Sequence, residues 1–268
     1  MTGILTTILT VCLYVIVFFL GASIGSFSLV VLRRSDRGEP WIKGRSHCET
    51  CGKTLQWYEL IPFFSYLFLG GKCSGCKTKI PPSHFVCETG LGTLFAVLFH
   101  LASMGKTGAT VVDTVICFAV VTVFWVASVS DVLYREANVL PMIVVGAAAG
   151  IWNMTRDWKY WYVFAVFVAA IVLLEVLGKK DNLLMLGMGD LYAAACILAI
   201  RYDFFSLVNI VGFSCLIGVV VHIGIALFSK KDITVPFIPY LFIGLVLDWF
   251  GISWVEAVKE LVYKLSSM

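Results

Sequence analysis

Charged residues are scarce in this chain of 268 residues, of which only 14% are Asp, Glu, Lys or Arg. A soluble domain carries about 25%, so an ordinary water-soluble fold is excluded. Instead, 60% of the residues are hydrophobic and the mean hydropathy is +0.93. Apolar runs long enough to cross a bilayer recur along almost the whole length. The composition therefore predicts an all-α polytopic membrane protein.

Several patterns that mark common enzyme classes are also absent. There is no G-x-S-x-G, H-E-x-x-H or P-loop pattern, so none of those three catalytic or nucleotide sites is indicated. A Rossmann-type glycine fingerprint is missing as well. No lysine or arginine precedes Arg33. Without a basic n-region or a small-residue cleavage site, the first apolar run is expected to be retained rather than removed as a signal peptide.

Eight apolar runs are predicted to be membrane-spanning helices. They cover residues 5–32, 85–104, 108–130, 139–154, 160–178, 187–200, 205–228 and 235–251. The loop from Arg33 to His84 carries nine lysines and arginines, which makes its side cytoplasmic by the positive-inside rule and leaves the N-terminus outside. The net charge of +3 comes largely from this asymmetry, so we expect no nucleic-acid partner.

Four of the nine cysteines form two C-x-x-C pairs in this loop, Cys48 with Cys51 and Cys73 with Cys76. Four thiolates at this spacing predict a closed tetrahedral Zn²⁺ site, and because no ligand position is left for water the metal is expected to be structural. A pair of disulfides is the alternative, but a cytoplasmic loop faces a reducing compartment. The other five cysteines lie in or beside apolar runs, where Cys acts as a small hydrophobe.

Between the cysteine pairs lies an apolar stretch, residues 57–69, broken by Pro62 and followed by Gly70-Gly71. It is too short to span a bilayer comfortably. One interpretation is a hairpin that lies on or dips into the membrane surface. The other is the hydrophobic core of a small cytoplasmic domain, and the sequence leaves the two even.

Two acidic residues lie at the cytoplasmic ends of predicted spans. Asp190 closes the run Gly187-Met188-Gly189-Asp190, and Asp131 follows Ser130 at the end of the third span. The glycines permit close approach of backbone and substrate. Because an ionised acid in a bilayer is costly, an intramembrane carboxylate indicates a functional site. Two such groups at one membrane face predict acid/base hydrolysis of a peptide in or beside the membrane.

With these residues in view, the chain resembles the type IV prepilin peptidases, leader peptidases of the GxGD aspartic class. In chain order, the resemblance is carried by Gly25–Phe27 with Arg33–Arg34, Arg45–Gly52, Ile61–Leu67, Gly71–Cys76, Glu88 with Gly92, Asp131, Gly187–Asp190 and Pro236–Pro239. It implies cleavage of the leader of type IV prepilins or pseudopilins at the cytoplasmic face of the bacterial inner membrane. Asp131 and Asp190 would be the catalytic pair, with Gly187 and Gly189 in the catalytic loop.

Members of that family often also N-methylate the new N-terminus with S-adenosylmethionine. By resemblance alone, Glu88 and Gly92 would bind this cofactor together with the zinc loop. The chain departs from the family pattern at Leu29 and at Ser83-His84-Phe85, which leaves open that it is a peptidase only. Since the loop and a leader are both basic, the acids expected to contact the leader are Glu49, Glu59, Glu88 and Glu136.

Two other function classes fit the same residues. One is a zinc-anchored membrane transporter in which the two aspartates relay a proton or cation, although no inverted repeat is evident. The other is a non-enzymatic scaffold of a secretion machine. On the peptidase interpretation, the first transmembrane helix covers residues 1–32, the zinc-binding domain 33–84, the transmembrane peptidase core 85–251 and a C-terminal amphipathic segment 252–268.

Overall fold

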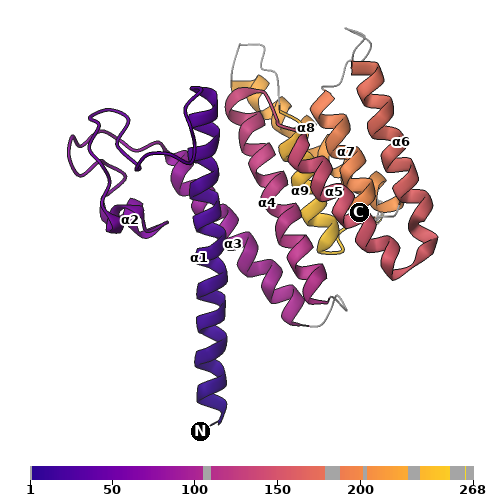
Figure 1. The fold of residues 1–268 in the computed structure, drawn as a ribbon, viewed down its shortest axis with the longest axis horizontal. Coiled ribbons are helices and arrows are strands. Elements are labelled where there is room, and N and C mark those ends of the chain that lie inside the picture. Colours follow the sequence, from indigo (N-terminus) through magenta and orange to yellow (C-terminus); the bar gives the residue numbers. More distant parts are fainter. Residues whose placement is uncertain are drawn as a thin grey trace. The chain divides into compact units, whose positions relative to one another are not determined.

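The computed structural model describes residues 2–104, 110–178, 188–201, 204–228, 236–253 and 263, which form helices and no β-strand (Figure 1). Each predicted span corresponds to a helix. These are α1 (Thr2–Asp36), α3 (Pro82–Ser103), α4 (Val111–Tyr134), α5 (Leu140–Arg156), α6 (Trp161–Gly178), α7 (Met188–Arg201), α8 (Phe204–Phe228) and α9 (Ile238–Trp249). A short turn, η2 (Trp158–Tyr160), precedes α6. The all-α prediction is confirmed.

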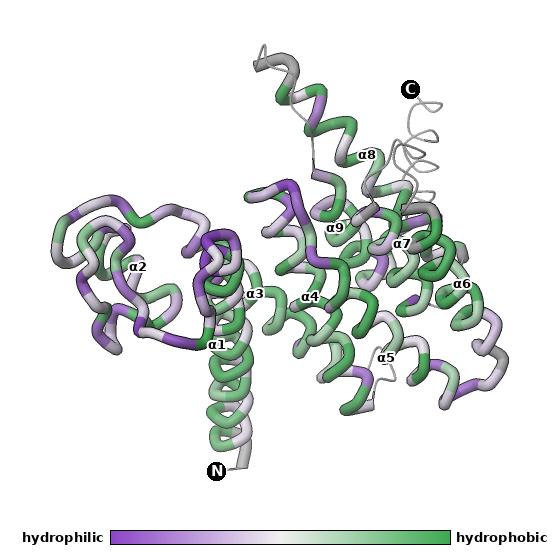
Figure 2. The backbone as a smooth tube through the Cα atoms, turned by 45° about the horizontal axis from the view of Figure 1, so that its top comes forward, coloured by the Kyte–Doolittle hydropathy of each residue, from purple (hydrophilic) through white to green (hydrophobic). Residues whose placement is uncertain are grey.

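Four helices of the described residues are long and apolar enough to cross a membrane: Ile4–Asp36 in α1, Pro82–Ser103, Val111–Tyr134, and Phe205–Ile225 in α8. Shorter apolar helices run from Trp161 to Leu174 and from Ile238 to Trp249. Figure 2 shows hydrophobic colour along most of the helices, while hydrophilic colour gathers in the loop between α1 and α3. These helices support an integral membrane protein, as the composition predicts.

The chain forms two compact units, Met1–Phe118 and Ala119–Met268. The division falls inside α4. The first unit holds α1, the cysteine loop and α3. The second holds α5 to α9 together with the C-terminal half of α4.

In the first unit, α1 and α3 pack closely through glycines. A Cβ at Gly21 or at Gly25 would come within 3.0 Å of a main-chain oxygen of α3. Gly92 on α3 lies equally close to α1, since a Cβ there would be 2.9 Å from the carbonyl oxygen of Phe18. Small residues spaced four apart let two helix backbones approach in this way. The contact positions the end of α1 beside the start of α3.

The apolar stretch between the cysteine pairs folds into η1 (Trp57–Leu60) and α2 (Phe64–Phe68). Of residues 57–69, all of which the structure describes, Glu59 alone is buried. The stretch is therefore not the core of a small domain. It is fastened at one end, where Phe63 stacks on Phe85 of α3 with ring centroids 5.7 Å apart.

In the second unit, α7 packs against α5, α6, α8 and α9. Its inward side is built of small side chains, and Cys196 of α7 touches Gly146 of α5. The helices α8 and α9 approach closely at Gly244, and the buried Ser214 hydroxyl donates to the carbonyl of Tyr240 at 3.0 Å. The small residues allow α7 to lie among four neighbours.

An ion pair joins the far ends of α7 and α9. Arg201 contacts the Asp248 carboxylate at 2.7 Å, and the amide of Asn209 on α8 donates to the same carboxylate at 2.9 Å. Asp248 is buried. An acid this deep in an apolar bundle needs charged and hydrogen-bonded partners, and here both come from neighbouring helices.

Candidate functional site

The two C-x-x-C pairs fold into two loops of the same shape. An isolated β-bridge closes each loop, pairing His47 with Thr54 and Lys72 with Lys79. In both loops the N–H of the first cysteine donates to the carbonyl five residues later, at 2.9 Å. The repeated C-x-x-C sequence pattern therefore folds twice into the same backbone hydrogen-bond pattern.

This geometry brings the four thiols together. The Sγ atoms of Cys48, Cys51, Cys73 and Cys76 all lie within 4.8 Å of one another and could hold a metal ion. All four cysteines are free, and the 3.8 Å between Cys48 and Cys76 Sγ is far longer than a disulfide bond of about 2.05 Å. The predicted ligand set is therefore assembled, and the alternative of two disulfides is not what the structure shows.

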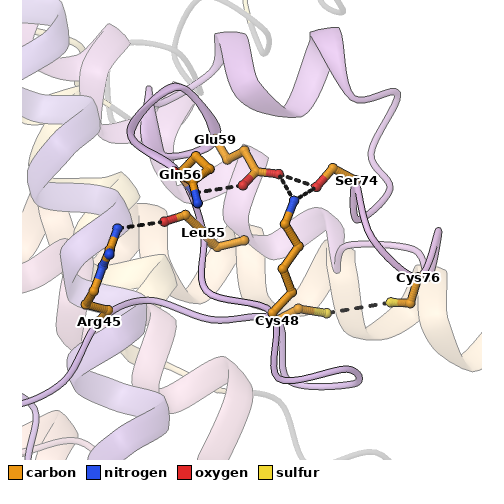
Figure 3. A network of polar contacts seen from close by, with 8 residues as sticks. Arg45, Cys48, Leu55, Gln56, Glu59, Ser74 and Cys76 are labelled. Carbon is orange, nitrogen blue, oxygen red and sulfur yellow. Dashed lines mark hydrogen bonds and ion pairs between the residues drawn. The ribbon is translucent and has the colours of Figure 1, made fainter.

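A buried carboxylate ties the two cysteine loops to each other (Figure 3). Glu59 accepts a hydrogen bond from the main-chain N–H of Gln56 at 2.7 Å, and Lys53 contacts it at 3.1 Å. Ser74, from the second loop, donates to the same carboxylate. The Gln56 N–H is the main reason that the pKa of Glu59 lies below its usual value, with Ser74 and Lys53 adding to it against the cost of burial. The Glu59 carboxylate is therefore engaged within the cysteine loops and the segment between them.

A cavity of about 310 Å³ lies between the end of α1, the cysteine loop and the start of α3. Its wall includes Arg33, Glu49, Tyr66, His84 and Glu88. Its volume falls at the lower end of the range of roughly 300–1,000 Å³ typical of small-molecule sites. The cavity brings charged groups from three chain segments to one place.

Glu88 is buried in this wall, and its carboxylate is already engaged. One oxygen accepts from the Ser26 hydroxyl at 2.7 Å, and the other accepts from the Phe63 N–H at 2.8 Å. Phe63 has φ 67° and ψ −55°, and the N–H of Phe64 donates to Pro62 O at 2.7 Å. This is a γ-turn of the rare, strained kind. Glu88 therefore fastens α1 and a strained turn to α3.

The arginines at the end of α1 hold the loop and its acids. Arg33 and Arg37 pair with Glu49 at 3.3 and 2.9 Å. Burial alone would raise the pKa of Glu49, but these two guanidinium groups bring it below its usual value. Arg34 donates to the carbonyl oxygens of Pro40, Trp41, Lys43 and Arg45.

The four acids expected to contact a basic leader differ in their surroundings. Glu59 and Glu88 are buried and hydrogen-bonded, and Glu49 is paired with two arginines. Glu136, just beyond α4, is exposed. Glu49, Glu59 and Glu88 would each have to give up a contact within the first unit before they met a partner. Glu136 is an exposed side chain of the second unit.

Gly92, predicted to bind the cofactor with Glu88, does not line the cavity. It lies one turn further along α3, against Phe18 of α1. Any effect of Gly92 on the cavity would therefore pass through the packing of the two helices.

In the second unit, Asp131 near the end of α4 lies beside the start of α9. Its carboxylate accepts a hydrogen bond from the main-chain N–H of Ile238 at 3.3 Å. Ile238 is the first residue of α9, and a proline follows it within the first turn, where its missing N–H is not needed. The free N–H groups and positive dipole end of a helix favour a carboxylate there. The hydroxyl of Ser130, one residue before Asp131, donates a hydrogen bond to the carbonyl of Glu136 and so closes the turn at the end of α4.

The start of α7 reaches the same residue. A Cβ on Gly189 would lie 3.6 Å from Cδ1 of Ile238, so Gly189 and Asp131 both adjoin Ile238. Asp190, the next residue, is half-buried in the first turn of α7. Gly187 lies outside the described residues. Segments far apart in the sequence thus meet at the first residue of α9.

The sequence analysis assigned no individual role to two residues in these sites. Phe63 carries the strained turn held by Glu88, and Ile238 supplies the N–H that meets Asp131. The second had a signal, since the run Pro236–Pro239 places a proline where helices begin. The first had none, because a bulky residue at positive φ is not predictable from its type.

Parts of the chain are similar in sequence to known proteins. Residues 19–102 match the family model described as the bacterial peptidase A24 N-terminal domain. The chain is 40% identical over 81 residues to the prepilin leader peptidase/N-methyltransferase of Myxococcus xanthus (strain DK1622), covering 30% of this chain and 24% of that protein. The chain thus spans about a quarter of the length of this relative.

Longer alignments reach other relatives of the same description. The Dichelobacter nodosus protein is 26% identical over 213 residues, 74% of this chain and 68% of its own length. The Pseudomonas aeruginosa protein is 26% identical over 225 residues, 80% and 73% respectively. No solved structure matches the chain. The resemblance to prepilin peptidases is confirmed.

Proposed function

We propose that this chain is a membrane aspartic endopeptidase that removes the leader of type IV prepilins or pseudopilins. Asp131 and Asp190 would be its catalytic pair, with Gly187 and Gly189 in the loop that carries Asp190. The observation that carries the proposal is the meeting of Asp131 and the Gly189–Asp190 turn at Ile238. The names of the relatives support the same activity.

The reaction needs one carboxylate and one carboxylic acid. The carboxylate takes a proton from a water molecule, whose oxygen attacks the scissile carbonyl carbon. The carboxylic acid donates a hydrogen bond to the carbonyl oxygen as negative charge develops there. When the tetrahedral intermediate collapses, the C–N bond breaks and the leaving amine takes the proton that the carboxylate removed from water. Two carboxyl groups that share a site do not both ionise easily, so one proton shared between them supplies both roles. The pair titrates as a unit, and neither aspartate is assigned a fixed role.

We further propose that the four cysteines hold a structural Zn²⁺. A tetrahedral site with Zn–S bonds of about 2.3 Å separates its sulfurs by roughly 3.8 Å. Cys48 and Cys76 Sγ are 3.8 Å apart, which supports the fit. Bound zinc would link the two cysteine loops and stabilise the module. Metal analysis of protein purified without chelator should find one zinc per chain.

A second activity, N-methylation of the new N-terminus, is favoured by the cavity beside Glu88. S-adenosylmethionine would supply the methyl group and fits the size class of the cavity. Glu88 and Gly92 would serve it, Glu88 from the wall and Gly92 through the contact of α1 with α3. The cysteine loop would lie in the cytoplasm of a bacterium and the N-terminus outside the inner membrane, in accord with the basic loop.

The test of the peptidase is cleavage of a purified prepilin by the full chain in vesicles. Asp131→Asn and Asp190→Asn should each lower the rate by about 10³-fold or more, since asparagine keeps the shape but not the acid/base function. Asp113→Asn is the matched control, because Asp113 lies at the opposite end of α4 and caps it by accepting from Thr110. Substantial cleavage by either catalytic variant would refute the aspartic mechanism, whereas no cleavage by the native chain would favour a transporter or scaffold.

A further inference from the structure

The segment between the cysteine loops exposes an apolar face. Its members are large hydrophobic or aromatic side chains with exposed fractions from 40% for Phe64 to 84% for Phe68. We call them the hairpin face: Trp57, Tyr58, Leu60, Phe64, Leu67 and Phe68. Six such side chains within twelve residues form a patch of the kind that marks an interaction surface.

The hairpin face continues the apolar surface of α1. Phe64 stacks on Phe19 of α1 with ring centroids 5.9 Å apart, and Phe68 stacks on Phe64 at the same distance. Phe19 precedes Arg33, the first charged residue of the helix, by roughly 21 Å along the axis. Phe64, and Phe68 stacked on it, are thus level with the apolar part of a candidate membrane span, far from its charged end.

This position is fixed by packing. Phe63 lies between the two helices, stacked on Phe85 of α3 and edge-on to Phe18 of α1 at 6.2 Å. The strained turn at Phe63 is held by the carboxylate of Glu88 at 2.8 Å. A backbone strain of this size persists only where surrounding contacts enforce it. The segment therefore presents its face at a set height along α1.

The composition of the face matches a bilayer interface. Tryptophan and tyrosine are enriched at the level of lipid headgroups, with phenylalanine and leucine suited to the acyl boundary. Lysines 72 and 79, both exposed on the neighbouring cysteine loop, could meet anionic headgroups. A face that contacts water, or one that packs into the core of a small domain, would not combine exposed aromatic side chains with neighbouring lysines beside a membrane helix.

We propose that the hairpin face is a membrane-contact surface, immersed in the leaflet on the cysteine-loop side of the bilayer that α1 crosses. The same segment also lines the cavity beside Glu88, through Leu60 at the edge of the hairpin face and through Tyr66 and Leu69 behind it. Lipid contact therefore sets the height of the cavity and of the metal loops relative to the membrane surface. This inference does not depend on Asp131 or Asp190, so a failure of either proposal leaves the other standing.

The test is photocrosslinking in the full chain. Phe68 is replaced by p-benzoyl-phenylalanine, and the protein is reconstituted in vesicles of phosphatidylcholine and phosphatidylglycerol that contain a tail-labelled lipid. The matched control carries the same group at Lys43, which is also exposed but lies at the charged end of α1, where Arg34 donates to its carbonyl at 2.9 Å. Irradiation should attach several-fold more lipid at position 68 than at position 43.

Equal lipid labelling at the two positions would overturn the proposal. So would a crosslink from position 68 to residues 119–268 of the same chain or to a second copy, because the face would then be covered by protein. Should the position-68 variant fail to insert, Trp57, exposed to 74%, provides a second site on the same face. The same outcomes then apply to it.

Discussion

At the scale of single residues, the cysteine loops differ at one backbone position. Gly52 and Lys77 each follow the second cysteine of a pair, and both adopt positive φ, 69° and 60°. Glycine takes this conformation freely, while a lysine there is strained. The two loops therefore share a shape that only one of them adopts at low cost.

Lys77→Gly should stabilise the pair of cysteine loops by about 1 kcal/mol, which is the order of the backbone strain that the substitution relieves. Gly52→Ala should destabilise it by a similar amount, because the same strain is introduced into the first loop. The midpoint of chelator-induced zinc release measures both effects. Lower resistance to chelator in Lys77→Gly than in the native chain would contradict the argument.

Glu59 gives the module a dependence on pH. Its pKa is lowered in the folded chain, chiefly by the Gln56 N–H, so its contribution is present above its unfolded value near 4.5 and is lost as the pH falls through the folded value. Glu59→Gln should release zinc faster at pH 7, because the contact with Lys53 is weakened. The difference from the native chain should shrink as the pH falls below about 4.5.

Glu39→Gln is the control for this experiment, since Glu39 is an exposed acid in the same loop. It should release zinc like the native chain throughout the titration. A constant difference between Glu59→Gln and the native chain from pH 7 to pH 3 would show that the charge of Glu59 is not what matters.

At the scale of elements, hydropathy alone located the helices well. The predicted run 205–228 became Phe204–Phe228, and 139–154 became Leu140–Arg156. A buried or lipid-facing helix is encoded by its own apolar residues, which are local in sequence. The segment 57–69 was ambiguous because its environment is set by Phe18, Phe19 and Phe85, which come from two other helices.

The contact of α1 with α3 depends on glycine at its closest point. Gly25→Ala places a Cβ against the Cys87 carbonyl, a main-chain atom that cannot move aside. The variant should lose roughly 1–3 kcal/mol of stability through overpacking. Gly224→Ala on α8 is the matched control, because a Cβ there meets nothing within 4 Å.

Thermal unfolding in detergent, followed by the near-ultraviolet signal, compares the two alanine variants. Gly25→Ala should unfold several degrees below the native chain and Gly224→Ala close to it. Equal melting temperatures for the two variants would show that α1 and α3 are not held by close backbone packing.

At the scale of the whole molecule, the two proposed activities draw on different units of the chain. Glu88 and Gly92 lie in the first unit, and Asp131 and Asp190 in the second. Glu88→Gln should lower methyl transfer from S-adenosylmethionine while cleavage persists. Asp131→Asn should abolish cleavage yet still methylate a pilin that has already been processed. Radiolabelled methyl transfer and leader cleavage, measured on the same preparations, decide this.

Two results would count against the separation. Loss of cleavage in Glu88→Gln would indicate that the turn at Phe63 supports both activities. No methyl transfer by a native chain that cleaves well would show that the chain is a peptidase only. Gly92→Ala reports on the same question, with its effect acting through the packing against Phe18.

The sequence by itself determined the membrane class, the helices and the four cysteines whose thiols come together. Each of these follows from local properties: the apolar content of a run, or the spacing of thiols within one tight loop. The carboxylates Asp131 and Asp190 were also visible, because an acid at the end of an apolar run is unusual wherever it lies.

Only the tertiary structure decided what these groups touch. Glu88 is engaged by Ser26 and Phe63, and Asp131 by the N–H of Ile238, more than a hundred residues away. Hydrogen bonds of this kind join segments distant in the chain. Two of the three donors, the N–H groups of Phe63 and Ile238, are main-chain atoms that residue type does not reveal. The placement of the hairpin face beside α1 has the same origin, in packing between elements that no single segment encodes.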